Sequence, residues 1–139
     1  MNTNIRNFAL GGIFAALLSS PLLNAQERAV AEIPFDFHVL NMTLPAGAYT
    51  VVRGASTHVL RVENNGGKDG IFLLAETNDL KGSVVDPKLT FHCYDNRCFL
   101  SQINMPGGRA YNLSKGKLEK EIASGGEKVA MAYVAFGTR

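Results

Sequence analysis

The sequence carries little charge, and neither sign dominates it. Of its 139 residues, 14 are Lys or Arg and 12 are Asp or Glu, which gives a formal net charge of +2. Charges this few and this balanced exclude a polybasic nucleic-acid arm and an acidic disordered tail, since both need long runs of one sign. Hydrophobic residues make up 46% of the chain, which is enough for the core of one domain. We therefore predict one folded domain with no nucleic-acid partner.

The chain also lacks an apolar run near its N-terminus that is long enough to cross a membrane as a helix. The run at 8–18 has 11 residues, whereas a spanning helix needs roughly 17–25. A stable membrane span is therefore not expected in the processed protein.

This short run instead has the layout of a secretory signal peptide. Arg6 precedes it, two serines and a proline end it, and Ala25 offers a small residue at a cleavage edge. We predict a signal peptide at 1–25, cleavage between Ala25 and Gln26, and a single exported β-domain at 26–139. Its location would be the periplasm or the extracellular space.

Cysteine is scarce, with Cys93 and Cys98 as the only two. Two thiols cannot complete a zinc shell, and their spacing is not the Cys-x-x-Cys of thiol oxidoreductases. In an exported protein a structural disulfide is favoured over a metal site or a redox pair. Asp95 and Asn96 between them are good residues for a two-residue hairpin turn, because both tolerate positive φ. That turn would place Cys93 opposite Cys98 at a non-hydrogen-bonded pair, with their Cα atoms about 4.5 Å apart.

The rest of the exported segment is typical of an all-β protein. Short apolar or alternating stretches are separated by turn residues and predict strands at 33–39, 48–53, 57–63, 71–75 and 129–136. We expect at most one short helix, near 114–123, and Gly116 argues against it. We predict a single-domain antiparallel β-sandwich or small β-barrel of about six to eight strands.

The hairpin that carries the two cysteines has one clearly apolar face. If the turn is placed as above, one face collects Leu89, Phe91, Cys93, Cys98 and Leu100. We assign this face to the core. His92 and Phe99 would pair on the opposite face, where Ile103 follows, so this second face should be partly covered as well.

Recognisable catalytic and cofactor motifs are absent from the sequence. The three histidines, His38, His58 and His92, lie in no His-x-His or His-Glu-x-x-His pair that would indicate a metal site. No Gly-x-Ser-x-Gly elbow, Walker loop or dinucleotide fingerprint occurs. We predict no cofactor, no metal and no catalytic residue.

Two blocks of sequence resemble a known family. IPFDFHV at 33–39 with LPAGAYTV at 44–51 is similar to the opening of small exported proteins that occur in many copies in acidobacterial genomes. The segment 91–101, followed by PGGR at 106–109, is similar to their second half. The resemblance covers most of 26–139 and implies export. It supplies neither an activity nor site residues, and the cysteine pair is not part of the family pattern.

Three functions remain to be compared. The first is a non-enzymatic exported β-domain with a structural or interaction role and an unknown envelope or extracellular partner. The second is a ligand-binding sandwich or barrel for a glycan or a small apolar molecule, with a cavity lined by Phe35, Phe37, Tyr49, Phe72 and Phe91. The third, a hydrolase, needs two ionisable groups that converge in a cleft. The specific ligand and the oligomeric state stay open.

Overall fold

A computed structural model describes residues 27–65, 70–79 and 86–137 of the chain. Within these ranges the chain forms eleven strands and one short helix, which confirms the predicted all-β class. The elements are β1 (Arg28–Ile33), β2 (Phe37–Val39), β3 (Met42–Leu44), β4 (Gly47–Arg53), β5 (Val59–Asn64), β6 (Gly70–Leu74), β7 (Glu76–Asp79), β8 (Lys88–Tyr94), β9 (Arg97–Asn104), β10 (Arg109–Asn112), α1 (Lys117–Ser124) and β11 (Val129–Ala135). The predicted signal peptide at 1–25 and its cleavage edge, Ala25 and Gln26, lie outside the described residues.

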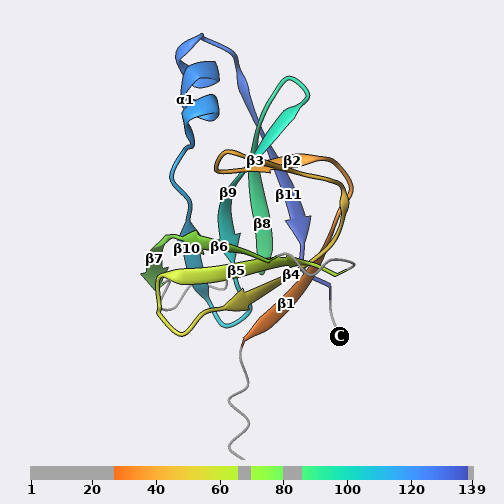
Figure 1. Cartoon of the computed structure of the whole chain (residues 1–139), viewed down its shortest axis with the longest axis vertical. Helices are drawn as coiled ribbons and strands as arrows, with labels where there is room; N and C mark the ends of the chain where they lie inside the picture. Colours follow the sequence, from red (N-terminus) through yellow and green to blue (C-terminus); the bar gives the residue numbers. More distant parts are fainter. Residues whose placement is uncertain (1–26, 66–69, 80–85, 138–139) are drawn as a thin grey trace, which may run out of the picture.

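The strands form two sheets that pack face to face as a sandwich. The first sheet has the order β1-β4-β5-β6, and the second has the order β11-β8-β9-β10-β7. The hairpin of β2 and β3 joins the second sheet through a parallel pairing of β2 with β9. Figure 1 shows the strands of one sheet crossing those of the other at a steep angle. In the described ranges the two sheets do not close into a barrel.

The core fills the space between the two sheets. Its large side chains that are less than 2% exposed are Ile33, Phe37, Val39, Tyr49, Val51, Leu60, Leu73, Leu89, Phe91, Ile103, Met105 and Tyr111. They come from both sheets and from the β2 strand and belong to a single cluster. This continuous apolar core is what holds the sheets together.

The first predicted strand, 33–39, is interrupted in the structure. The strand β1 ends at Ile33, and β2 begins only at Phe37. Pro34 follows β1 directly and has no N–H to donate to a ladder. The described ranges contain more strands than the predicted six to eight. Very short strands account for part of the difference, since β2 and β3 have only three residues each.

The β8–β9 hairpin matches its prediction closely. Cys93 pairs with Cys98, and Tyr94 pairs with Arg97 across the turn. Asp95 has the positive φ, 57°, that the tight turn requires. The disulfide joins the two strands with the Cα atoms 4.0 Å apart. It is compatible with an oxidising compartment.

The prediction for Ile103 was wrong, because β9 contains a β-bulge. Leu100 pairs with Phe91 and Gln102 pairs with Thr90, so Ser101 is an extra residue that is paired with no residue of β8. The extra residue shifts the alternation of side chains by one position. Leu100 and Ile103 therefore both face the core, at 6% and 0% exposure, and Ser101 faces the opposite side.

The helix α1 lies over the outer face of the β8–β9 hairpin (Figure 1). It begins at Lys117, later than the predicted start, and Gly116 precedes it in an extended conformation. A Cβ at Gly116 would come within 2.8 Å of the Leu40 carbonyl oxygen. Glycine is thus needed here because the chain passes closely over the β2–β3 turn on its way into the helix.

Candidate functional site

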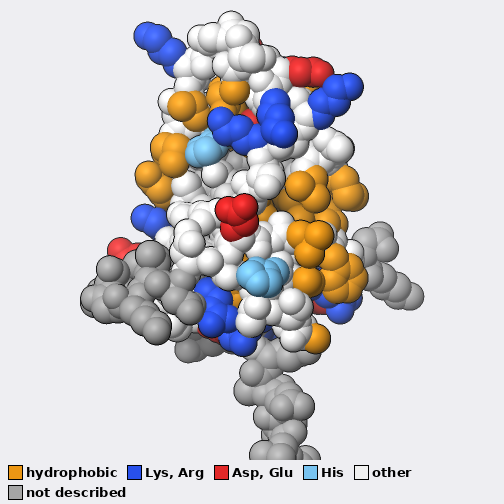
Figure 2. All heavy atoms as spheres, turned by 90° about the vertical axis from the view of Figure 1, so that its left-hand side faces the viewer, with side chains coloured by type: hydrophobic (Ala, Val, Ile, Leu, Met, Phe, Trp, Pro, Cys, Tyr) orange, Lys and Arg blue, Asp and Glu red, His pale blue; other side chains and the backbone are white. Residues whose placement is uncertain are grey.

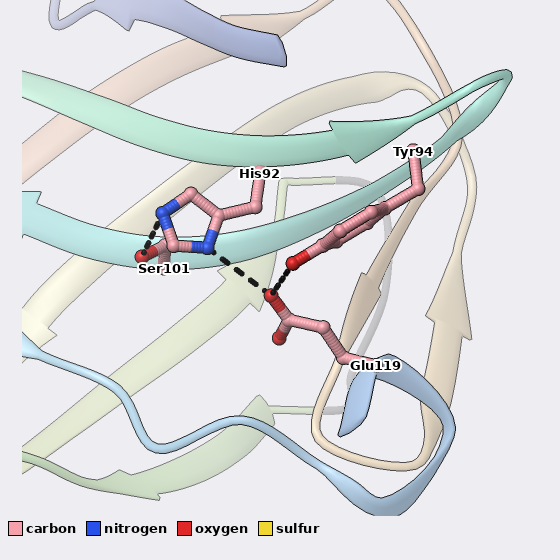
Figure 3. A network of polar contacts seen from close by, with 4 residues as sticks. All are labelled: His92, Tyr94, Ser101 and Glu119. Carbon is pink, nitrogen blue, oxygen red and sulfur yellow. Dashed lines mark hydrogen bonds and ion pairs between the residues drawn. The ribbon is translucent and has the colours of Figure 1, made fainter. Parts of the chain in front are cut away.

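Four polar side chains form a connected network on the outer face of the second sheet (Figure 3). The imidazole of His92 lies at its centre, with Nδ1 3.1 Å from the Glu119 carboxylate and Nε2 3.2 Å from the Ser101 hydroxyl. The Tyr94 hydroxyl donates to the same carboxylate oxygen over 3.3 Å. His92 and Tyr94 come from β8, Ser101 from the bulge of β9, and Glu119 from α1.

The donors and acceptors in this network follow from the chemistry of its members. A carboxylate only accepts hydrogen bonds, so His92 Nδ1 must be the donor toward Glu119. In the neutral imidazole Nε2 is then the acceptor, and the Ser101 hydroxyl donates to it. The Glu119 side chain is only 4% exposed. Burying a carboxylate is costly unless it is hydrogen-bonded, and His92 and Tyr94 supply that compensation.

Apolar contacts surround the network and fix the helix in the same place. Tyr94, Phe99 and Ile122 form a second buried cluster between the hairpin and α1. The His38 ring stacks on Phe99 with the ring centroids 4.7 Å apart. This covering confirms the prediction that the face with His92 and Phe99 is partly buried.

The order of contacts, serine to histidine to carboxylate, is that of a hydrolytic triad. A triad also needs donors aimed at the oxygen that becomes negative in the transition state. The neighbours of Ser101, Leu100 and Gln102, are paired in the β8–β9 ladder, and main-chain groups of a paired strand lie in the plane of the sheet. They do not point toward a substrate above the Ser101 hydroxyl. What the contacts show is that the network fastens α1 to the sheet.

The sequence did not single out Ser101 or Glu119. Glu119 lies in a segment where lysines and glutamates interleave, a pattern that is typical of a solvated helix surface and does not indicate burial. The contact of Ser101 with His92 depends on the bulge in β9, and the sequence does not indicate that bulge. The only local signal was His92, which the alternation of the hairpin correctly placed opposite the core.

The five aromatic residues proposed to face a ligand do not lie together. Phe37, Tyr49 and Phe91 are at most 1% exposed and pack edge to face, with 5.1 Å between the Phe37 and Tyr49 rings and 5.5 Å between the Phe37 and Phe91 rings. Phe35 is half-buried against Phe91. Phe72 is 67% exposed. Three of the five thus fill the core, and this packing counts against a cavity lined by all of them.

Tyr49 has a structural role at the edge of the core. Its hydroxyl donates to the Pro45 carbonyl oxygen over 2.6 Å. Burial raises the pKa of this hydroxyl above its ordinary value of 10.0. The contact ties β4 to the turn that precedes it, and the hydroxyl is not available to a ligand.

The three histidines do not form a common site. His38 contacts the Thr43 hydroxyl through Nδ1 at 3.0 Å, His92 belongs to the network with Glu119, and His58 is exposed. In the described ranges no three His, Cys, Asp or Glu side chains lie close enough together to hold a metal ion. The same ranges contain no helix with the length and hydropathy that a membrane crossing requires.

A shallow depression of about 210 Å³ lies on the outer face of the first sheet. Its lining includes Arg28, Val52, Arg53, Arg61, Glu63 and Phe72. Arg53 is paired with Glu27 at 3.6 Å and Arg61 with Glu63 at 2.8 Å. Two of its three arginines are thus already compensated, so the depression does not present a concentrated positive charge to an anionic ligand.

The strand β11 has exposed apolar side chains at the edge of the second sheet, as β6 has at the edge of the first, where Phe72 and Leu74 are 67% and 78% exposed. Strand β11 ends the second sheet, and near its C-terminal end the described chain also meets β1, through the bridge between Phe136 and Ala31 and a hydrogen bond from the Gly137 N–H to the Val30 carbonyl oxygen. Val129, Met131 and Tyr133 are 52%, 48% and 59% exposed. On the side of the molecule that Figure 2 shows, which is the left-hand side of Figure 1, hydrophobic side chains lie in separate groups among charged and polar ones.

This edge lacks the usual protection against pairing with another strand. Natural edge strands carry charges, prolines or bulges that prevent such pairing. The seven residues of β11, VAMAYVA, contain no charge, proline or glycine, and the pairing with β8 is regular throughout. The sequence predicted a strand here but not its place at an edge, because a continuous apolar run ordinarily indicates burial on both faces.

Comparison of the chain with protein-family models, with characterised proteins and with solved structures returned no match.

Proposed function

We propose that this protein is an exported, non-enzymatic interaction domain that binds an envelope or extracellular partner through the free edge of β11. The observation that carries the proposal is the unprotected apolar edge of this strand. An extended partner segment would add one strand to the sheet, with main-chain hydrogen bonds for affinity and alternate side chains for specificity. The partner surface would be apolar at alternate positions, since Val129, Met131 and Tyr133 lie on one face of β11.

The disulfide and the contact of α1 with the second sheet support this assignment because they make β8, the neighbour of the binding edge, rigid. The strand β8 next to β11 is held on its far side by the Cys93–Cys98 bond and on its outer face by the contact of His92 with Glu119. Met131 lies directly opposite His92. A binding edge that is already in its final conformation loses little entropy when a partner pairs with it.

Export is supported by the predicted signal peptide and by a disulfide that is compatible with an oxidising compartment. An enzymatic role has less support, because in the described ranges the contacts of Ser101, His92 and Glu119 join the sheet to α1, and the Glu119 side chain is only 4% exposed. A ligand cavity has less support for the reason given above, since the aromatic side chains proposed to line it mostly fill the core.

Site-specific photo-crosslinking in the native host tests the proposal. A photoreactive phenylalanine analogue replaces Met131 in one strain and Leu118 in another, since Leu118 is also an exposed apolar residue, at 39%, but lies on α1. We expect a crosslinked adduct from position 131 and none from position 118. No adduct at 131, or equal adducts at both positions, would overturn the proposal. A third strain carries the analogue at Phe72 on the first sheet, which is 67% exposed and should give no adduct; an adduct there in place of one at 131 would overturn the proposal as well.

A further inference from the structure

We infer that the strand which pairs with β11 is β11 of a second copy of this chain, in antiparallel orientation about a two-fold axis at Met131. The inference rests on the proposed function of β11 as a binding edge. It follows from three features of the strand: the direction of its free main-chain groups, the side chains that would meet, and the charges at its end.

The register of the hairpin determines which main-chain groups of β11 are free. Tyr94 and Arg97 flank a two-residue turn and therefore hydrogen-bond to each other. Because the direction of these groups alternates along a strand, Cys93 turns its N–H and C=O toward β11. Its partner there is Ala130, so Ala130 points its own groups back toward β8.

The same alternation continues along β11. Ala132 and Val134 share the direction of Ala130, and the bond from the Phe136 N–H to the Pro87 carbonyl, on the β8 side, agrees with this parity. Val129, Met131 and Tyr133 therefore point their N–H and C=O groups at the free edge. They are also the three residues of β11 whose large apolar side chains are exposed.

A two-fold axis at Met131 satisfies all of these free groups together. Met131 would pair with Met131 of the second copy, and Val129 with Tyr133 of the second copy in both directions. Each such pair exchanges two hydrogen bonds in an antiparallel ladder, about six in total. The pairing ends before Ala135, so the bridge between Phe136 and Ala31 is preserved.

The side chains that would meet suit each other. Val129 opposite Tyr133 is a β-branched residue opposite an aromatic one, a favourable cross-strand pair. On the inner face Ala130 would lie opposite Ala132, and their small side chains allow close approach of the strands. The two methionines at the axis are flexible and adapt their packing to the available space.

The charges next to β11 favour the antiparallel orientation. Glu127 and Lys128 precede the strand. In the register about Met131 the two copies of Lys128 are six residues apart along the ladder, about 20 Å, which exceeds the screening length at physiological salt. Parallel pairing in register would place Lys128 beside Lys128 and Glu127 beside Glu127. In the antiparallel register, therefore, neither Lys128 nor Glu127 lies beside its own copy.

Cysteine substitution tests the axis, using the protein purified after export and analysed without reductant. Met131→Cys should form a disulfide-linked dimer, because the two residues at the axis are directly opposite. Val129→Cys is the matched control on the same face and should not, because its two copies would be about 14 Å apart, beyond the reach of a disulfide. Equal crosslinking of both variants, or of neither, would overturn the inference.

Molar mass in solution, measured by light scattering after size exclusion, provides a second test. The unmodified protein should be a dimer. Met131→Lys places two positive charges opposite each other at the axis and should weaken dimerisation at least tenfold, whereas Leu118→Lys should leave the dimer unchanged. A monomeric protein whose position 131 photo-crosslinks to a different protein would overturn the second copy and leave the proposed function intact. A monomer without any adduct at that position would overturn both.

Discussion

Replacing Glu119 by glutamine tests whether the polar network fastens α1 to the sheet. Glu119→Gln keeps the size of the side chain but removes the charge that accepts hydrogen bonds from His92 and Tyr94. Hydrogen bonds to charged groups contribute about 1.5–3 kcal/mol. The Tyr94 contact is long and His92 is partly exposed, so the lower part of that range applies. We expect a loss of about 1–2 kcal/mol in the free energy of unfolding, or about 5–10 °C in Tm.

Chemical denaturation of purified protein measures this loss, with Glu121→Gln as the matched control. Glu121 lies on the exposed side of the same helix, so its substitution should change stability by less than about 0.5 kcal/mol. A double-mutant cycle with His92→Ala should give a coupling of about 1 kcal/mol between His92 and Glu119. Additive effects of the two substitutions, or equal losses for Glu119→Gln and Glu121→Gln, would refute the role assigned to the network.

Two further predictions concern the core and the hairpin. Replacing Cys93 and Cys98 by alanine should lower the free energy of unfolding by about 2 kcal/mol under oxidising conditions, because the bond closes only a short loop. Under reducing conditions the same replacement should change it very little. Equal losses in both conditions would mean that the thiols are unpaired. The raised pKa of Tyr49 means that the folded state favours the neutral hydroxyl, so its contribution is complete below pH 10 and is lost as pH rises above 10. Unfolding measured between pH 9 and 11.5 should show a smaller alkaline loss in Tyr49→Phe than in the unmodified protein, and an equal loss would contradict this assignment.

Local sequence was sufficient for the hairpin because its information is contained in consecutive residues. Asp95 and Asn96 define a two-residue turn, the turn defines the register, and the register places Cys93 opposite Cys98. No distant part of the chain takes part in these steps. The all-β class was predictable for the same reason, since turn residues and alternation act over short distances.

The features that sequence reasoning missed depend on distant parts of the chain. Glu119 is buried because α1 folds over β8, and a pattern of charges on the helix alone reads as a solvated surface. Strand β11 is apolar throughout but lies at an edge, and the order of strands in a sheet follows from the topology of the whole chain. The inward direction of Ile103 depends on the bulge at Ser101, which no local composition marks.

The bulge at Ser101 has a consequence for how strand β9 tolerates change in length. Before this residue the strand presents Leu100 to the core, and after it the strand presents Ile103, three positions later rather than two. The spacing between core-facing residues of β9 is therefore one residue longer at the bulge than elsewhere in the strand. A substitution at Ser101 removes one hydroxyl from the network around His92. Deletion of Ser101 would leave Gln102 as the one residue between Leu100 and Ile103, which is the regular spacing of a strand, so both side chains would still face the core. Strand β9 can therefore lose a residue at the bulge, whereas loss of a residue elsewhere in the strand would turn the side chains that follow it to the opposite face.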